Sequence, residues 1–394
     1  MSSVGEPVSH FGDFQNEIYL QGLGGQVPPW PLAVQELERR AYEVMTTEAE
    51  GYVAGGAGSE ATMRANAEAF DRHRLVPRML RGITERDLST TVLGTPMPAP
   101  VLLAPVGVLS ICHPEGERAA ARAAASVGLP FVQSNASSTP MEDVAEAMGD
   151  AARWFQLYWP RDHEIAASLV ARAEASGHSA VVVTLDTWQL GWRPRDLELA
   201  YLPFLRGEGV ANYFSDPAFR RGLEKPPEED LISAVLHWVR NFSNPALTWD
   251  DVSFLREHTR LPILLKGICH PDDARQALDI GVDGIVVSNH GGRQADGAVG
   301  ALDALPGVVA AVGDRVPVLL DSGVRTGADA IKAYALGADA VLLGRLYVWG
   351  LALGGEEGVR HVLRAFLADL DINLALVGHA RPSELGPEVL ADRP

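Results

Sequence analysis

One histidine stands in a sequence context that suits proton transfer. His290 follows Ser288-Asn289 and precedes Gly291-Gly292-Arg293-Gln294, so it lies on a tight glycine loop directly after an apolar run. Histidine titrates near neutral pH and is the commonest general base in enzymes. Asp186, which ends another apolar run, is a candidate to hold the second imidazole nitrogen and stabilise the protonated ring. No H-E-x-x-H pattern occurs, so we predict proton transfer here and no metal site.

A lysine and two arginines supply positive charge at the ends of other apolar runs. Lys266 would form a Schiff base, stabilise negative charge on a cofactor ring, or pair with a carboxylate, and the sequence leaves these roles open. Arg325 and Arg345 stand beside glycines in Asp321-Ser322-Gly323-Val324-Arg325 and Gly344-Arg345. Glycine lets the backbone approach a ligand closely and arginine makes forked hydrogen bonds to anions, so we predict a phosphate site there.

Eight short apolar runs, each followed by a stretch with helical spacing, are expected to position these groups. They are residues 100–105, 130–134, 154–158, 180–186, 262–267, 284–289, 317–323 and 340–345. Apolar strands that alternate with helices are typical of a parallel sheet covered by helices, and eight such units predict an α/β fold, a (β/α)8 TIM barrel. Because active sites of these barrels lie at the carboxyl ends of the strands, the polar residues that end the runs are predicted to surround one site.

Two segments fall outside this repeat. Residues 1–99 are predicted to form an N-terminal helical extension with the first active-site turn, in which 32–50 is one helix and 52–58 a flexible turn. Residues 100–394 are predicted to form the barrel. The interval between the fourth and fifth runs is much longer than the others, which indicates a lid insertion at about 195–250. Its Pro-, Glu- and Arg-rich part, 208–230, is expected to be mobile and not part of the core.

Composition argues against several classes of partner. The chain has 33 basic and 51 acidic residues, and the net charge of -18 disfavours binding to nucleic acid or to anionic membranes. Two cysteines without C-x-x-C spacing indicate neither a disulfide framework nor a metal cluster, and favour a cytoplasmic location. No run of eighteen apolar residues and no secretory leader pattern occur, so we expect neither a membrane span nor secretion.

The run Ser288-Asn289-His290-Gly291-Gly292-Arg293-Gln294 resembles the signature of the FMN-dependent 2-hydroxy acid dehydrogenases and oxidases. The resemblance extends over nearly the whole chain, and its further matching runs are 52–56, 155–158, 185–187, 265–267, 321–325 and 344–345. It implies an FMN-dependent oxidoreductase that oxidises a small L-2-hydroxy acid and reacts with O2. It also implies a homo-oligomer, either a tetramer or an octamer.

The same resemblance implies roles for individual residues. His290 would accept the substrate proton, with Asp186 as its partner. The substrate carboxylate would be bound by Tyr52, Tyr158, Arg193 and Arg293. FMN would be held by Pro105, Val106, Gly107, Ser134, Gln156, Thr184, Lys266, Ser288, Asp321, Ser322, Gly323, Val324, Arg325, Gly344 and Arg345. Lys266 would lie at the ring edge where negative charge appears on reduction.

Three further runs resemble one branch of that family, the lactate 2-monooxygenases. They are residues 16–19, 187–197 and 204–207, and Gly107 also fits this branch because oxidase relatives often carry alanine there. The resemblance implies conversion of L-lactate and O2 to acetate, CO2 and water, with pyruvate and peroxide held in the site.

Alternatives to this branch remain. Within the family, the alternative is an oxidase that releases the 2-keto acid and H2O2. Residues 133–138 match the family only at Ser134, and this segment helps to shape the pocket for the substrate side chain. Outside the family, the alternatives are a Schiff-base barrel aldolase that uses Lys266 and a flavin-storing barrel without catalysis.

Overall fold

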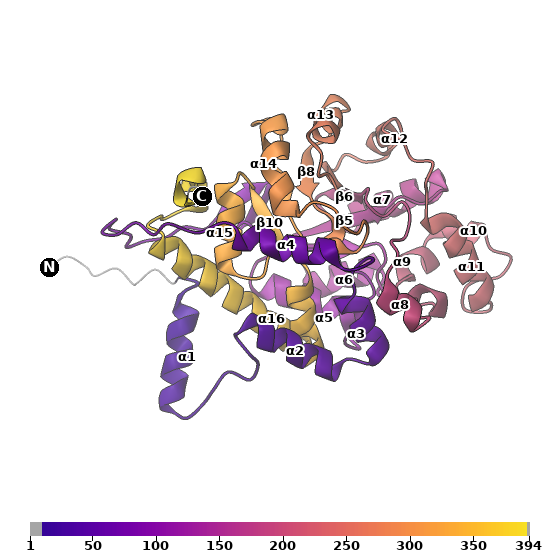
Figure 1. Cartoon of the computed structure of the whole chain (residues 1–394). Helices are drawn as coiled ribbons and strands as arrows, with labels where there is room; N and C mark the ends of the chain where they lie inside the picture. The colour runs from indigo at the N-terminus through magenta and orange to yellow at the C-terminus, as the bar shows by residue number, and fades with distance from the viewer. Residues whose placement is uncertain (1–9, 392–394) are drawn as a thin grey trace.

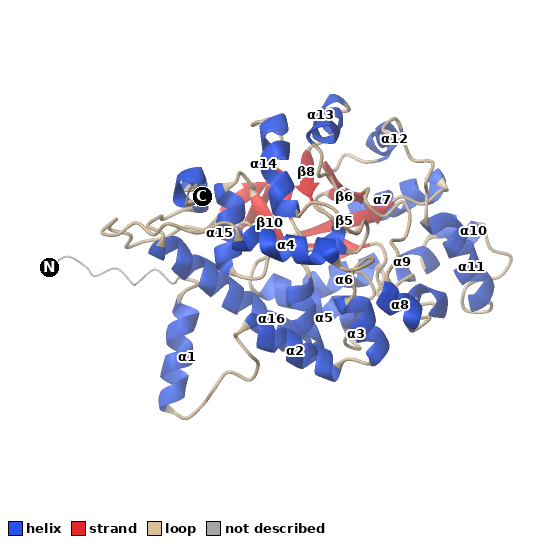
Figure 2. Cartoon of the chain, in the orientation of Figure 1, coloured by secondary structure: helices blue, strands red, loops and turns tan. Residues whose placement is uncertain are grey.

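The computed structural model describes residues 10–391, and its centre is a closed barrel of eight parallel strands in the order β10-β3-β4-β5-β6-β7-β8-β9. The strands are β3 (Val101–Leu103), β4 (Phe131–Ser134), β5 (Arg153–Tyr158), β6 (Val181–Thr184), β7 (Ile263–Lys266), β8 (Gly284–Val287), β9 (Val318–Leu320) and β10 (Ala340–Leu343). Seven of the eight predicted runs contain one of these strands, and the eighth, 154–158, misses only the first residue of β5, so the predicted (β/α)8 barrel is confirmed (Figures 1 and 2).

Apolar side chains from every strand fill the barrel interior. The inward-facing set is fully buried and consists of Leu102, Val132, Trp154, Val182, Leu264, Val286, Leu319 and Leu342. An antiparallel hairpin of β1 (Thr90–Val92) and β2 (Thr95–Met97), which the sequence analysis did not predict, adds Val92 and Met97 to this cluster. Trp154 Nε1 donates to Thr95 Oγ1 at 3.0 Å. The hairpin therefore covers the amino-terminal end of the barrel.

Helices surround the strands and bury their outward-facing side chains. They are α5 (Gly116–Ser126), α6 (Met141–Met148), α7 (His163–Ala175), α12 (Asp251–His258), α13 (Pro271–Asp279), α14 (Ala301–Val312), α15 (Gly327–Ala335) and α16 (Arg345–Leu376). Non-helical backbone at Gly354 and Gly355 divides α16 into two parts. The helices and the strands share one large apolar core. Loops between strand ends and helices are thereby fixed at the carboxyl end of the barrel.

The N-terminal extension contains four helices: α1 (Asp13–Leu23), α2 (Val34–Val44), α3 (Thr47–Ala54) and α4 (Ala61–Asp71). The single helix predicted at 32–50 is wrong, because Thr46 leaves the helical conformation and caps α3 by accepting a hydrogen bond from Ala49 N. The predicted flexible turn begins only after Ala54 and is held by the bond from Ala57 N to Gly292 O. Helix α1 has no buried residue and projects from the body (Figure 1).

The long interval between β6 and β7 folds into short helices. They are α8 (Pro194–Glu198), the 3-10 turn η2 (Pro203–Arg206), α9 (Ala211–Phe214), α10 (Pro217–Arg221) and α11 (Leu231–Phe242). The expectation that 208–230 lies outside the core is wrong, because Val210, Tyr213 and Phe219 are fully buried in the main apolar cluster. Their side chains anchor the insertion against the barrel.

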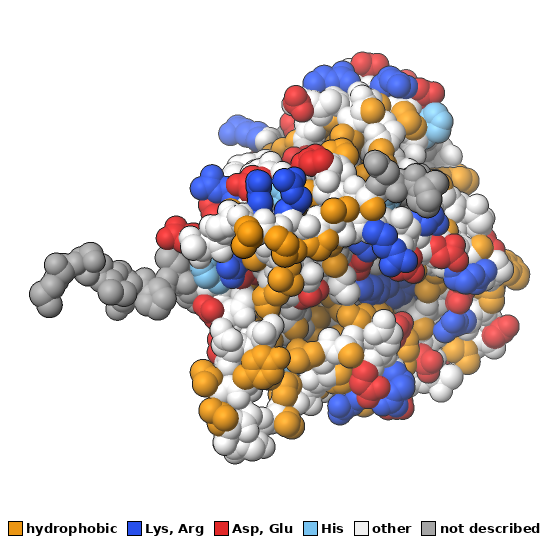
Figure 3. Space-filling model, turned by 60° about the vertical axis from the view of Figure 1, so that its left-hand side comes forward, with side chains coloured by type: hydrophobic (Ala, Val, Ile, Leu, Met, Phe, Trp, Pro, Cys, Tyr) orange, Lys and Arg blue, Asp and Glu red, His pale blue; other side chains and the backbone are white. Residues whose placement is uncertain are grey.

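The surface carries both signs of charge. On the face shown in Figure 3, acidic and basic side chains are interspersed. Within residues 10–391, no helix combines the length and the apolar character that a bilayer span requires.

Candidate active site

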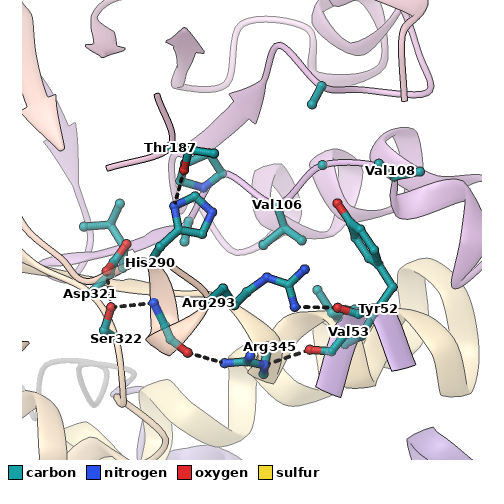
Figure 4. Close-up of a pocket in the computed structure, with 18 of the residues that line it drawn as sticks. Tyr52, Val53, Val106, Val108, Thr187, His290, Arg293, Asp321, Ser322 and Arg345 are labelled. Carbon is teal, nitrogen blue, oxygen red and sulfur yellow. Dashed lines mark hydrogen bonds between the residues drawn. The ribbon is translucent and has the colours of Figure 1, made fainter. Parts of the chain in front are cut away.

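A cavity opens at the carboxyl end of the barrel, where most of the predicted site residues meet. Those that line it are Tyr52, Pro105, Val106, Gly107, Tyr158, Arg193, Lys266, His290, Arg293, Asp321, Ser322, Gly323, Val324, Arg325, Gly344 and Arg345. The cavity is bounded by strand-end loops, by Tyr52 and Val53 of α3 (Figure 4), and by Phe204 and Phe242 of the insertion. The other predicted residues, Ser134, Gln156, Thr184, Asp186 and Ser288, lie outside its lining and are largely buried.

His290 and Asp186 form a close pair inside the barrel mouth. His290 Nδ1 lies 2.7 Å from Asp186 Oδ1, and Thr187 Oγ1 contacts both groups, at 2.8 Å from Asp186 Oδ1 and 3.1 Å from the imidazole. His290 Nε2 is on the other side of the ring, 3.4 Å from Tyr158 Oη. A carboxylate at Nδ1 selects the tautomer in which Nε2 is an unprotonated base. The arrangement can therefore take a proton at Nε2.

The backbone of the histidine loop is unusual and well supported. His290 has φ of 57°, in the left-handed region that a non-glycine residue adopts at a cost of about 1–3 kcal/mol. Ser288 Oγ accepts from His290 N at 3.1 Å, and Ser322 Oγ accepts from Gly291 N at 2.9 Å. These bonds from two neighbouring strand ends hold the imidazole in place.

Burial and charge set the protonation states of this pair. Burial lowers the pKa of His290 below its usual range, and nearby Lys266 and Arg193 act in the same direction, while Asp186 opposes them. Burial alone would raise the pKa of Asp186, but His290 and Lys266 outweigh it and lower the pKa to about 2. At neutral pH the site thus contains a neutral imidazole and an ionised carboxylate.

Lys266 is buried at the end of β7, at the edge of the cavity, and has two polar partners. Its Nζ lies 2.9 Å from Asp321 Oδ2 and donates to Ser288 Oγ at 2.8 Å. Burial would lower the pKa of the lysine, but Asp321 and Asp186 raise it above its usual value, so the ammonium stays charged. A charged lysine is a poor nucleophile, which disfavours the Schiff-base role left open by the sequence.

The two arginines near His290 are held in different ways. Arg293 Nη1 donates to Tyr52 O at 2.5 Å and to Gly55 O at 2.7 Å, and the guanidinium lies over the Tyr52 ring (Figure 4). Arg193 is 5% exposed and donates to Arg293 O at 3.1 Å and to Gln294 Oε1 at 2.9 Å. Burial and the charge of Arg293 lower the pKa of Arg193 to about 10. Two adjacent cations that face a cavity form a binding site for an anion.

Sequence reasoning missed two residues that complete this site. Gln294 accepts from Arg193 and donates to Asp186 O at 2.7 Å and to Gln189 O at 2.9 Å. Thr187 supports the His290–Asp186 pair. Both residues lie in the runs that carry the family resemblance, so the sequence contained a signal for them. It did not show which residues they contact.

The residues at the strand ends fit a flavin ring. Ser134 Oγ donates to Gln156 Oε1 at 2.8 Å, which leaves Gln156 Nε2 buried without a partner in the described part of the chain. Thr184 Oγ1, on the neighbouring strand, is buried and also lacks a partner among residues 10–391. Buried polar groups are normally hydrogen-bonded, so these two indicate a polar ligand edge beside Lys266. The carbonyl and N–H groups of a flavin pyrimidine ring match them.

The ends of β9 and β10 fit the other end of the cofactor. Arg325 lies over the Trp349 ring, and the one hydrogen bond found for its guanidinium within residues 10–391 goes to Val324 O, so other donors are available to an anion. A Cβ on Gly344 would meet nothing within 4 Å, so space for a ligand lies beside this backbone. At Gly323 a glycine is needed for packing against α4 and not for ligand space. Its φ is 107°, and a Cβ there would meet Phe70 and Asn66.

Comparisons with known proteins agree with this geometry. The family model for FMN-dependent dehydrogenases matches residues 41–392. A Penicillium citrinum protein named FMN-dependent alpha-hydroxy acid dehydrogenase qulF is 47% identical over 94% of this chain and 94% of its own length. An L-lactate oxidase from Lysinibacillus sphaericus (strain C3-41) is 45% identical over 92% of this chain and 93% of its own. The crystal structure of a mandelate oxidase matches with a TM-score of 0.81 and 39% identity, covering 92% of this chain and 98% of that one.

Proposed function

Because the chain belongs to the FMN-dependent dehydrogenase family and is an FMN-dependent 2-hydroxy acid oxidoreductase, we propose that its substrate is L-lactate and that it is a lactate 2-monooxygenase. The overall reaction converts L-lactate and O2 to acetate, CO2 and water. The L-lactate oxidase relative supports the substrate, whereas the mandelate oxidase structures support an aromatic 2-hydroxy acid as the competing candidate. The observation that favours L-lactate is a group of four aromatic side chains that line the cavity, one of which, Tyr158, stacks on His290.

These four aromatic side chains narrow the space for the substrate side chain. Tyr52, Tyr158, Phe204 and Phe242 line the cavity, and their centroids lie 5.3 Å apart for Tyr158–Phe242, 5.8 Å for Phe204–Phe242 and 6.5 Å for Tyr52–Phe204. Trp238 stacks on Phe204 with a 4.8 Å separation and holds it from behind. Closely packed rings adjust little to a larger guest, so a methyl group is favoured over a phenyl ring.

The chain's own residues orient the substrate and move its proton. Arg193 and Arg293 bind the carboxylate, with hydroxyl contacts from Tyr52 and Tyr158, so that the substrate hydroxyl faces His290 Nε2. His290 takes the proton, and Asp186 stabilises the imidazolium that forms. FMN, when bound, accepts the two electrons released from the substrate carbon. Gln156, Thr184 and Lys266 would hold its ring, and Arg325 its phosphate. Arg345 lines the same cavity, but its guanidinium already donates to Val53 O, Gly291 O and Gly55 O, so its contact with the phosphate stays a prediction of the family resemblance.

Retention of the first product separates a monooxygenase from an oxidase. If pyruvate stays beside the H2O2 formed from O2, the peroxide attacks the keto carbon and the products are acetate, CO2 and water. If pyruvate leaves first, pyruvate and H2O2 are released. Phe204 and Phe242 come from the insertion, whose buried anchors keep it over the cavity, and this supports retention.

The remaining organisation follows from the same proposal. We assign residues 1–99 to an extension, 100–394 to the FMN-binding barrel and about 195–250 to the lid, of which 1–9 and 392–394 lie outside the described residues. The family resemblance supports a homo-oligomer, a tetramer or an octamer. The sparse cysteines support a cytoplasmic location.

Product analysis tests the proposal. The holoenzyme is mixed anaerobically with L-lactate while flavin absorbance is followed, and O2 is then admitted and acetate, pyruvate and H2O2 are assayed. Bleaching followed by acetate with little free peroxide is expected. Pyruvate and peroxide in equal amounts would instead establish the oxidase, and bleaching by L-mandelate but not L-lactate would overturn the substrate. Phe204→Ala removes one of the four aromatic side chains that line the cavity. It is expected to shift products from acetate toward pyruvate and H2O2.

A further inference from the structure

The loop that carries His290 rests on a helix of the N-terminal extension. Helix α4 packs against the 3-10 turn η3 (His290–Gly292) and against α14, which follows the loop (Figure 1). Thr62 and Asn66 lie one turn apart on α4, are both buried, and form hydrogen bonds with residues in the range 289–301. The extension therefore holds the segment that contains the proposed base.

Asn66 and Asn289 form a reciprocal pair of amide hydrogen bonds. Asn66 Nδ2 donates to Asn289 Oδ1 at 2.8 Å, and Asn289 Nδ2 donates to Asn66 Oδ1 at 2.7 Å. Backbone donors fix which atom of each amide is the oxygen: Ala301 N donates to Asn66 Oδ1 at 3.0 Å. Gly292 N donates to Asn289 Oδ1 at 3.1 Å. Position 66 thus needs a side chain that donates and accepts at once, which an amide does.

Asn289 directly precedes the base, and its side chain closes the histidine turn. The bond that Asn289 Oδ1 accepts from Gly292 N spans His290, whose φ of 57° lies in the left-handed region. A non-glycine residue keeps this conformation only where the surrounding contacts impose it. The bonds to the two serines described above hold the start of the turn, and Asn289 holds its end. Asn66 fixes the Asn289 amide in the orientation that this bond requires.

We propose that Asn66 is a positioning residue, which acts through Asn289 to hold the His290 imidazole in the orientation that proton transfer requires. This inference rests on the proposed function, in which His290 Nε2 takes the substrate proton. It extends that function by giving the N-terminal extension a part in the chemical step. Arg293, on the same loop, depends less on this support, because its guanidinium donates separately to two backbone carbonyls of the extension. Loss of Asn66 should therefore slow the reaction more than it weakens substrate binding.

Anaerobic flavin bleaching tests the proposal. FMN-saturated Asn66→Ala is mixed in a stopped-flow instrument with L-lactate, or with L-mandelate if only that acid bleaches the parent. The dependence on substrate concentration gives the bleaching rate constant and the apparent substrate Kd. We expect the rate constant to fall roughly 10- to 100-fold, because a displacement of about 1 Å at the reacting groups can cost about 100-fold, while the apparent Kd changes far less. Asn66→Ser, which keeps a hydroxyl at this position, is used if the alanine variant does not fold.

Thr62→Val is the matched control. Thr62 Oγ1 donates to Ala295 O at 2.7 Å and accepts from Ala298 N at 2.9 Å. The change to valine keeps the size of the side chain and removes two hydrogen bonds between the same helix and the same loop, farther along the loop from His290. It should lower the free energy of unfolding but leave the bleaching rate constant at the parental value. Equal slowing in Thr62→Val, or a parental rate constant in Asn66→Ala, would overturn the proposal.

A double variant shows whether Asn66 acts through Asn289. In Asn289→Ala the bond that closes the histidine turn is already lost, so the addition of Asn66→Ala should slow bleaching no further. Additive slowing would mean that Asn66 acts by another route and would overturn the proposal. A parent enzyme whose flavin is bleached by neither acid would instead refute the proposed function, and this inference with it.

Discussion

Gln294 offers a sharp test of how the site is held together. Its Oε1 accepts from Arg193 Nη2 at 2.9 Å, and its Nε2 donates to Asp186 O at 2.7 Å and to Gln189 O at 2.9 Å. The Gln294 side-chain amide therefore joins the histidine loop to the segment 186–193, which carries Asp186, the partner of His290, and Arg193, which is proposed to bind the substrate carboxylate. We expect Gln294→Leu, which keeps the size of the side chain and removes both polar ends, to weaken substrate binding and chemistry together.

The strengths of these hydrogen bonds set the size of the expected losses in stability and activity. A bond to a charged group contributes about 1.5–3 kcal/mol and a neutral one about 1 kcal/mol. Gln294 Oε1 also accepts a longer bond from Gly191 N, at 3.4 Å, so loss of one charged and three neutral bonds lowers the free energy of unfolding by about 4–6 kcal/mol. The part that acts on Arg193 is the charged bond, and about 1.5–3 kcal/mol corresponds to a fall in kcat/KM of roughly 10- to 150-fold. In Gln294→Glu the acceptor for Arg193 remains, but a carboxylate oxygen faces two carbonyls, so kcat should fall more than KM rises.

Steady-state kinetics with L-lactate and urea unfolding of the holoenzyme measure these effects. Gln189→Leu is the matched control, because its side chain is exposed and only its backbone carbonyl takes part in the network. It should retain parental kinetics and stability. A Gln294→Leu enzyme with parental kcat/KM would refute the reasoning, since it would mean that Arg193 does not need this anchor.

Three further outcomes follow from the buried charges. Because burial lowers the pKa of His290, with Asp186 opposing, the basic form predominates at neutral pH, so the acid limb of kcat/KM should lie below pH 6.5; a limb above that value contradicts the assignment. Asp186→Asn should bind FMN normally but lower the rate of anaerobic bleaching at least about 100-fold, as seen by stopped flow, and parental bleaching would exclude it as the partner. Lys266→Met leaves the buried Asp321 without its lysine, and should lower the free energy of unfolding of the apoprotein by about 3–5 kcal/mol in urea titrations. The double variant Lys266→Met/Asp321→Asn should recover part of this loss. If it recovers none, the lost charge pair is not the cause.

The barrel was predictable because its signals are local. Each strand is a short apolar run that ends in polar residues, and this pattern is readable without knowledge of distant segments. The hairpin of β1 and β2 was missed because its three-residue strands are too short for such a pattern. The break at Thr46 was also missed, although a threonine is a common N-cap and the signal was present.

The sequence alone determined the chemical inventory of the site: the histidine on its glycine loop, the lysine that ends a strand, and the arginines beside glycines. Only the tertiary structure decided which groups meet. Gln294 contacts Arg193 across 101 positions of sequence, and Asn66 of the extension contacts Asn289 across 223 positions. Periodicity records which face of a strand or helix is buried, because that depends on near neighbours. A hydrogen bond between distant loops depends on the packing of everything between them, and no local pattern encodes it.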